Sequence, residues 1–330
     1  VCSSDLPPLV VASSVIEVSA SRGPEGVEIR NLAVNAQRLT ATAQGTLSSE
    51  ASDLRANLNL ASLTDADPEL AGSLSAEAVV SGGQGMRRLA LNGEATDLIL
   101  GIAELDRTLA GRTNFNLIAQ EADGSFRVEQ LRLANPQLTV DGQGNFVPGQ
   151  LDARFDLSVP DLAVLGRGLS GALRAQATAS ESGGTQQFSV TGTGTELRLG
   201  QEDVDGALTG TTRFDLQATR RDGVVTIQSL DIANQQLNAS ATGTIGANAT
   251  DIDGSIDIRS LASFGRGWRG ALSLEGSVSD DGTGVRRFDV TGTGQDLALG
   301  ASQVDGALTG TTTLALRGTQ SGSSFTIEQG

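Results

Sequence analysis

The 330 residues carry a net charge of −16, contain no histidine, and include nine Phe, one Trp and no Tyr. The acidic balance argues against a nucleic-acid-binding surface, because such surfaces gain affinity from clustered Lys and Arg. Without histidine the chain lacks the usual general base and the usual zinc ligand, so we expect no enzyme, no metal site and no cofactor. Scarce aromatic residues favour a thin, extended apolar face over a thick core.

The start of the chain differs from the rest. Residues 1–6, V-C-S-S-D-L, break the pattern that follows, and we expect them to be a non-native flank. They include the only cysteine, Cys2, which excludes an internal disulfide. The later sequence contains no run of roughly 18 apolar residues, the length that a membrane-spanning helix needs.

Internal repeats organise the remainder. Residues 27–47 align without gaps to residues 126–146 and 225–245, each 99 positions further along, and V-D-G-A-L-T-G-T-T stands at both 204–212 and 304–312. A fixed period of this kind is typical of repeat architectures. We therefore divide the chain, as one continuous β array, into the end of an earlier repeat (7–53), two repeats (54–150 and 151–251) and a truncated repeat (252–330).

Within each repeat the apolar residues recur at every second position, as when Leu272 and Leu274 alternate with Ser273 and Glu275. This spacing predicts about six half-buried strands per repeat. Short Gly-containing connections such as 122–124 and 221–223 favour antiparallel hairpins, and a change of parity between residues 227 and 230 predicts a bulge. The expected fold is all-β: an elongated, repetitive antiparallel sheet curled into a taco-like open trough.

The apolar stripe is the candidate site. We interpret residues 204–212 as a strand that presents Leu208 to the trough and threonines to water. The residues expected to line the trough share strand parity: Leu173, Phe188, Val190, Leu197, Leu199, Leu208, Phe214, Leu216, Leu272, Leu274, Phe288, Val290, Leu297, Leu299, Leu314 and Leu316.

Three further patterns receive structural interpretations. G-x-G-x-x-G occurs at 166–171 and 265–270, but strands are expected to follow, so we predict Gly-rich bends rather than dinucleotide sites. The acids at 203–205 and 251–257 lack the Gly and Glu of a calcium loop and are predicted to form turns. The arginine pairs at 87–88, 220–221 and 286–287 are predicted to be solvated hairpin ends.

The repeats V-T-I-Q-S-L-D-I-A-N-Q-Q-L-N-A-S-A-T-G-T-I (225–245) and V-T-G-T-G-x-x-L-x-L-G (190–200) resemble the middle region of the TamB family. Members of this family are inner-membrane subunits of the translocation and assembly module of Gram-negative bacteria, within the AsmA-like, bridge-like lipid-transfer proteins. The resemblance covers about residues 7–330.

The resemblance implies an internal fragment of a periplasmic protein, held in the inner membrane by an N-terminal helix that this sequence lacks. It implies transport of phospholipid between the membranes, or outer-membrane protein assembly and secretion, with acyl chains lying in the trough. It also implies an outer-membrane TamA-like partner, contacted through a missing C-terminal region. The residues alone leave open a secreted or surface β-repeat adhesin with a filled core.

Overall fold

The computed structural model describes residues 14–329, apart from residues 25, 49, 66, 167, 248, 265–266, 281 and 323. The suggested non-native flank, with Cys2, lies outside the described residues, as do residue 167 of the first G-x-G-x-x-G segment and residues 265–266 of the second. The chain divides between Pro160 and Asp161 into two compact units, which we call the N-terminal and the C-terminal unit.

The N-terminal unit is built from ten described strands with two short helical turns. The strands are β1 (Val15–Arg22), β2 (Gly26–Asn35), β3 (Leu39–Ser48), β4 (Ser52–Leu60), β5 (Ala71–Gly83), β6 (Met86–Ile99), β7 (Arg112–Ala122), β8 (Ser125–Ala134), β9 (Thr139–Val147) and β10 (Gln150–Val159). The helical turns are η2 (Leu63–Asp65) and α1 (Ala103–Thr108).

The C-terminal unit repeats this plan. Its described strands are β11 (Leu169–Ser182), β12 (Thr185–Leu199), β13 (Thr211–Arg221), β14 (Val224–Ala233), β15 (Leu237–Ile245), β16 (Thr250–Ile258), β17 (Arg269–Asp280), β18 (Val285–Ala298), β19 (Thr311–Ser321) and β20 (Ser324–Gln329). Its helical turns are η3 (Leu162–Val164), α2 (Glu202–Asp205), η4 (Gly206–Leu208), η5 (Leu261–Phe264), α3 (Ser302–Asp305) and η6 (Gly306–Leu308). No described helix is long and apolar enough to cross a membrane.

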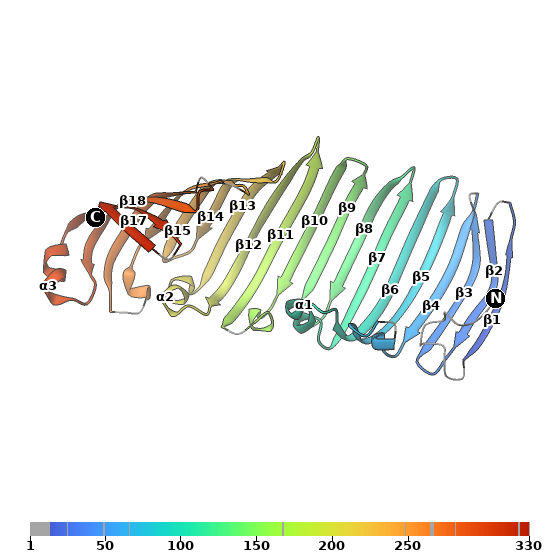
Figure 1. Cartoon of the computed structure of the whole chain (residues 1–330). Coiled ribbons are helices and arrows are strands. Elements are labelled where there is room, and N and C mark those ends of the chain that lie inside the picture. Colours follow the sequence, from blue (N-terminus) through green and yellow to red (C-terminus); the bar gives the residue numbers. More distant parts are fainter. Residues whose placement is uncertain are drawn as a thin grey trace. The chain divides into compact units, whose positions relative to one another are not determined.

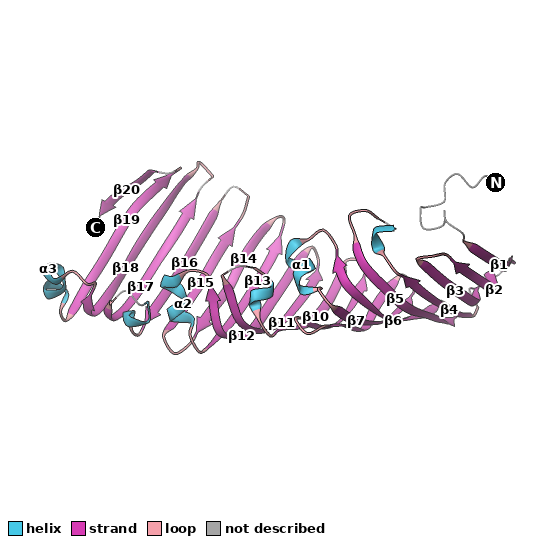
Figure 2. Ribbon diagram, turned by 90° about the horizontal axis from the view of Figure 1, so that it is seen from below, coloured by secondary structure: helices cyan, strands magenta, loops and turns pink. Residues whose placement is uncertain are grey.

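In each unit every strand pairs antiparallel with its neighbour in the chain, β1 with β2 through to β9 with β10, and β11 with β12 through to β19 with β20. Among the described residues the outer strands of a unit do not pair with each other, so each sheet stays open. The strands are bent and twisted, and each sheet is curled rather than flat (Figures 1 and 2). The predicted all-β, antiparallel, open fold is confirmed.

Hairpins with tight turns join the strands at one end, which we call the hairpin end. Asp222 and Gly223 have φ values of 51° and 80°, and Asp123 and Gly124 have values of 49° and 74°. Two successive positive φ angles are the mark of the type I′ turn, which matches the twist of a two-stranded ribbon. These Asp-Gly hairpins were predicted from the sequence and are confirmed.

The predicted bulge is also present. The register of β14 against β15 shifts between Ile227 and Leu230. Gly243, opposite Ile227, has a φ of 145°, and a Cβ added there would lie 2.1 Å from the carbonyl oxygen of Asp251. Only glycine fits this close approach of neighbouring strands.

Two predictions about local structure are wrong. Residues 204–208 are not part of a strand: they belong to α2 and η4, and β13 begins only at Thr211. The acids Asp251, Asp253 and Asp257 do not form turns, because they alternate along β16 on its polar face. The acids of β16 alternate with Ile252, Ile256 and Ile258, a spacing that is typical of a strand. The segment 204–208 is too short to show a helical period.

Candidate functional site

The strands of the C-terminal unit present one continuous apolar face. The antiparallel registers align its residues in rows that run across the sheet. The three middle rows pass through Phe188, Leu216 and Leu274, and every in-register residue in them is Ala, Gly, Val, Leu, Ile or Phe. The N-terminal unit carries three equivalent rows, through Val80, Leu117 and Phe115.

Towards the hairpin end this apolar face is open to solvent. The fractional exposures are 36% for Phe188, 44% for Ile245, 43% for Val278, 39% for Leu316 and 66% for Phe325. Within neither unit do the described residues place a second sheet over its apolar face. The filled core that an adhesin-like solenoid would need is therefore absent from the described part of each unit.

The opposite end, which we call the helical end, is closed. There α2 and η4 fold over the apolar face in the C-terminal unit, and α3 with η6 lies at the same end of its strands (Figures 1 and 2). Ala207 and Leu208 are 1% and 8% exposed and pack with Leu237, which is 7% exposed. Phe264 of η5 packs against this cluster and against a second one, formed by Ile258, Leu261 and Leu297.

Polar side chains fasten α2 and η4, which we call the edge turn, to the sheet. Asp205 Oδ1 accepts a hydrogen bond from the backbone N–H of Leu199 at 2.6 Å. At the base of the loop Glu196 and Gly210 are joined twice: the Glu196 N–H donates to the Gly210 carbonyl at 2.8 Å, and the Gly210 N–H donates to Glu196 Oε1 at 3.1 Å. Asp305 and Asp296 make the equivalent contacts around α3.

Asn234, in the turn between β14 and β15, fastens the edge turn from the other side. Its Nδ2 donates to the Ala207 carbonyl at 2.8 Å and to Thr212 Oγ1 at 3.1 Å. Its Oδ1 accepts from the N–H groups of Gln236 at 2.7 Å and Leu237 at 2.8 Å. Asn135 forms the same four bonds in the N-terminal unit, so the repeated A-N-x-Q-L sequence encodes this fastening.

The sixteen residues expected to line a trough fall into three groups. The three middle rows, and the next row towards the helical end, contain Leu173, Phe188, Val190, Phe214, Leu216, Leu272, Leu274, Phe288, Val290, Leu314 and Leu316. The helical end contains Leu208, which belongs to η4 itself, and Leu197 and Leu297, which pack in the clusters formed there. Leu199 and Leu299 lie at the strand ends beyond these clusters and are 50% and 45% exposed.

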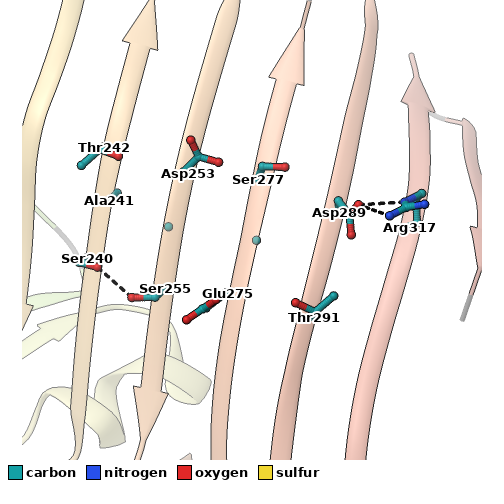
Figure 3. A pocket seen from close by; sticks show the side chains of 12 residues that line it. Ser240, Ala241, Thr242, Asp253, Ser255, Glu275, Ser277, Asp289, Thr291 and Arg317 are labelled. Carbon is teal, nitrogen blue, oxygen red and sulfur yellow. Dashed lines mark hydrogen bonds and ion pairs between the residues drawn. The ribbon is translucent and has the colours of Figure 1, made fainter.

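The other face of the C-terminal unit is polar. A shallow hollow of about 550 Å³ lies there across β15 to β19, lined by hydroxyl and carboxylate groups (Figure 3). Ser240 and Ser255 hydrogen-bond at 2.8 Å, and Arg317 donates to Asp289 at 2.8 Å. The hollow is wide and open, and its one arginine already pairs with Asp289, so the apolar face is the stronger candidate for a ligand.

Chemically, the apolar face can hold hydrocarbon but offers no reactive group in its middle rows. The sequence did not predict the edge turn or the short helices α1 and α3, because each helix is shorter than two helical turns and leaves no helical periodicity. One sequence signal does mark the edge turn: it is bounded by two glycines, Gly200 and Gly210. Both adopt a positive φ in the structure.

Comparisons with known proteins add no assignment: no protein family model, no curated protein and no solved structure matches this chain.

Proposed function

We propose that this chain binds and conducts the acyl chains of phospholipids on its apolar sheet faces. The observation that supports the proposal is the set of uninterrupted middle rows, which contain only apolar residues and remain solvent-accessible towards the hairpin end. Large exposed apolar patches on soluble proteins mark sites where another apolar surface binds. Each CH₂ group removed from water contributes about 0.8 kcal/mol, so an acyl chain is a strongly favoured occupant.

The form of the surface favours transit over storage. The rows repeat similar apolar side chains from strand to strand, so an acyl chain exchanges similar contacts as it moves. On this proposal the chain is a middle segment of a TamB-like, AsmA-like protein of the Gram-negative periplasm. It would carry phospholipid between the membranes or assist outer-membrane protein assembly with a TamA-like partner.

A matched pair of substitutions on β19 tests the proposal. Leu314 lies in a middle row opposite Gly292, and its neighbour Thr313 points to the polar face opposite Thr293. Leu314→Arg places a charge among the apolar rows, and we expect it to abolish capture of fluorescent phospholipid from vesicles. Thr313→Arg adds the same charge on the other face and is expected to leave capture unchanged, with circular dichroism verifying that both variants are folded. Equal capture by both variants would refute the apolar face as the lipid site.

A further inference from the structure

The apolar face of the C-terminal unit is covered in part at one end and open at the other. At the helical end, Leu208 of η4 and the strand residues Leu237, Ile258 and Leu297 are each at most 8% exposed. At the hairpin end no helical turn covers the face among the described residues, and Ile245 and Val278 are 44% and 43% exposed. An amphiphile lying on this face therefore meets the least obstruction when its head group lies at the hairpin end.

The residues in register at the hairpin end include two arginines on the apolar side of the sheet. Arg286 follows the parity of Phe288 and Val290, but it lies opposite Asp280 and pairs with that carboxylate at 3.7 Å. Arg220 follows the parity of Leu216 and Ala218 on β13. These two positions differ in how their charge is balanced.

Arg220 lies between two neutral neighbours, Gln186 on β12 and Val225 on β14. The nearest acid in this row, Glu181 on β11, accepts a hydrogen bond from Gln186 at 3.2 Å, and the adjacent Asp222 pairs with Arg221 at 3.8 Å. Arg220 is exposed and forms no ion pair within the described part of the chain. It is a cation without a counter-ion at the open rim of an apolar surface.

We infer that Arg220 binds the anionic phosphate of a lipid head group while the acyl chains lie across Phe188, Leu216 and Ile245. This inference rests on the proposed function. A guanidinium presents paired N–H donors that match two phosphate oxygens, which a neutral or purely hydroxylated head group cannot replace. The C-terminal unit would thereby prefer anionic phospholipids to neutral diacylglycerols, and would hold them with the head group at the hairpin end.

The experiment measures transfer of lipid to the whole chain from vesicles of digalactosyldiacylglycerol, a bilayer lipid without phosphate, with fluorescent phosphatidylglycerol and fluorescent diacylglycerol as the two probes. The matched variants are Arg220→Gln and Arg213→Gln, which remove a charge from opposite faces of the same strand. We expect Arg220→Gln to weaken phosphatidylglycerol binding roughly fivefold at low salt, to leave diacylglycerol unchanged, and to lose most of its effect at about 1 M salt. Arg213→Gln should change neither probe.

The outcomes separate the two proposals. If neither probe binds the unsubstituted chain, the proposed lipid-binding function itself fails. If both probes bind and Arg220→Gln weakens them equally, or weakens neither, lipid binding stands but the head-group role of Arg220 is overturned. Equal effects of Arg220→Gln and Arg213→Gln would likewise overturn it, because they would show a response to net charge alone.

Discussion

At the scale of single residues, the asparagines in the β14–β15 and β8–β9 turns have the clearest structural role. Asn234 satisfies four partners at once, and two of them, the carbonyl of Ala207 and the N–H of Leu237, belong to the buried cluster beneath the edge turn. A smaller side chain would leave both groups without a partner in a site that water reaches poorly. Such losses cost about 1–3 kcal/mol for each unsatisfied group.

We therefore expect Asn234→Ala to lower the free energy of unfolding of its unit by about 2–4 kcal/mol. Asn135→Ala should produce a similar loss in the N-terminal unit, because its bonds are the same. The control is Asn238→Ala, which truncates an exposed asparagine on the polar face of β15 and should change stability by less than about 0.5 kcal/mol. Urea denaturation followed by circular dichroism measures all three, and an equal loss in Asn238→Ala would contradict the role given to Asn234.

At the scale of elements, the edge turn and its counterpart, α3 with η6, show that the same sequence can be buried to different extents. The blocks 204–212 and 304–312 are identical, and each contains the end of a short α-helix, a 3₁₀ turn and the start of a strand. Leu208 is 8% exposed because η5 and the Asn234 turn lie beside it. In the second block Leu308 is only partly buried and Val304 is 48% exposed.

This difference predicts unequal costs for the same substitution in two identical segments. Leu208→Ala should destabilise the chain by about 2–4 kcal/mol, as for a buried leucine whose cavity does not collapse. Leu308→Ala should cost about half as much, since water already reaches part of that side chain. Denaturation midpoints of the two variants at unchanged m-value provide the comparison, and equal midpoints would mean that the flanking turn adds nothing to the packing of Leu208.

Sequence reasoning succeeds on these elements where the cause is local and fails where it is tertiary. The strands follow from alternation, the hairpins from Asp-Gly pairs and the bulge from one change of parity, because each of these patterns sets its own backbone. Parity also places Leu216 and Leu314 on one face. Alternation gave no hint of the edge turn at Leu208, because so short a helical segment leaves no periodicity of its own. How deeply Leu208 is buried depends on Asn234, distant in the sequence, and on Phe264. For the same reason the closed end of the face could not be predicted.

At the scale of the whole molecule, both units combine an all-apolar set of middle rows with large side chains left in water. Phe126 and Phe146 of the N-terminal unit are 43% and 41% exposed, and Phe325 and Ile327 of the C-terminal unit are 66% and 65% exposed. Large contiguous apolar patches are rare on monomeric soluble proteins, whereas here such a surface belongs to the native sheet. A neutral apolar dye therefore distinguishes the native chain from a partly unfolded one, because its fluorescence should change differently in the two cases when urea or a substitution changes the stability of the chain.

We expect the native chain to bind Nile red saturably in buffer, with a blue-shifted emission that phosphatidylglycerol displaces. Mild urea, below the unfolding transition, should not increase the signal, because the binding surface is already present in the folded sheet. If the dye bound only partly unfolded molecules, its fluorescence would instead increase as urea is added. That fluorescence would disappear in variants with raised stability. Leu314→Arg should reduce native binding and Thr313→Arg should not, since only the first charge enters the middle rows. Emission that stays at the level of dye in buffer would show that the apolar faces are covered in solution, and the lipid-binding proposal would then lose its physical basis.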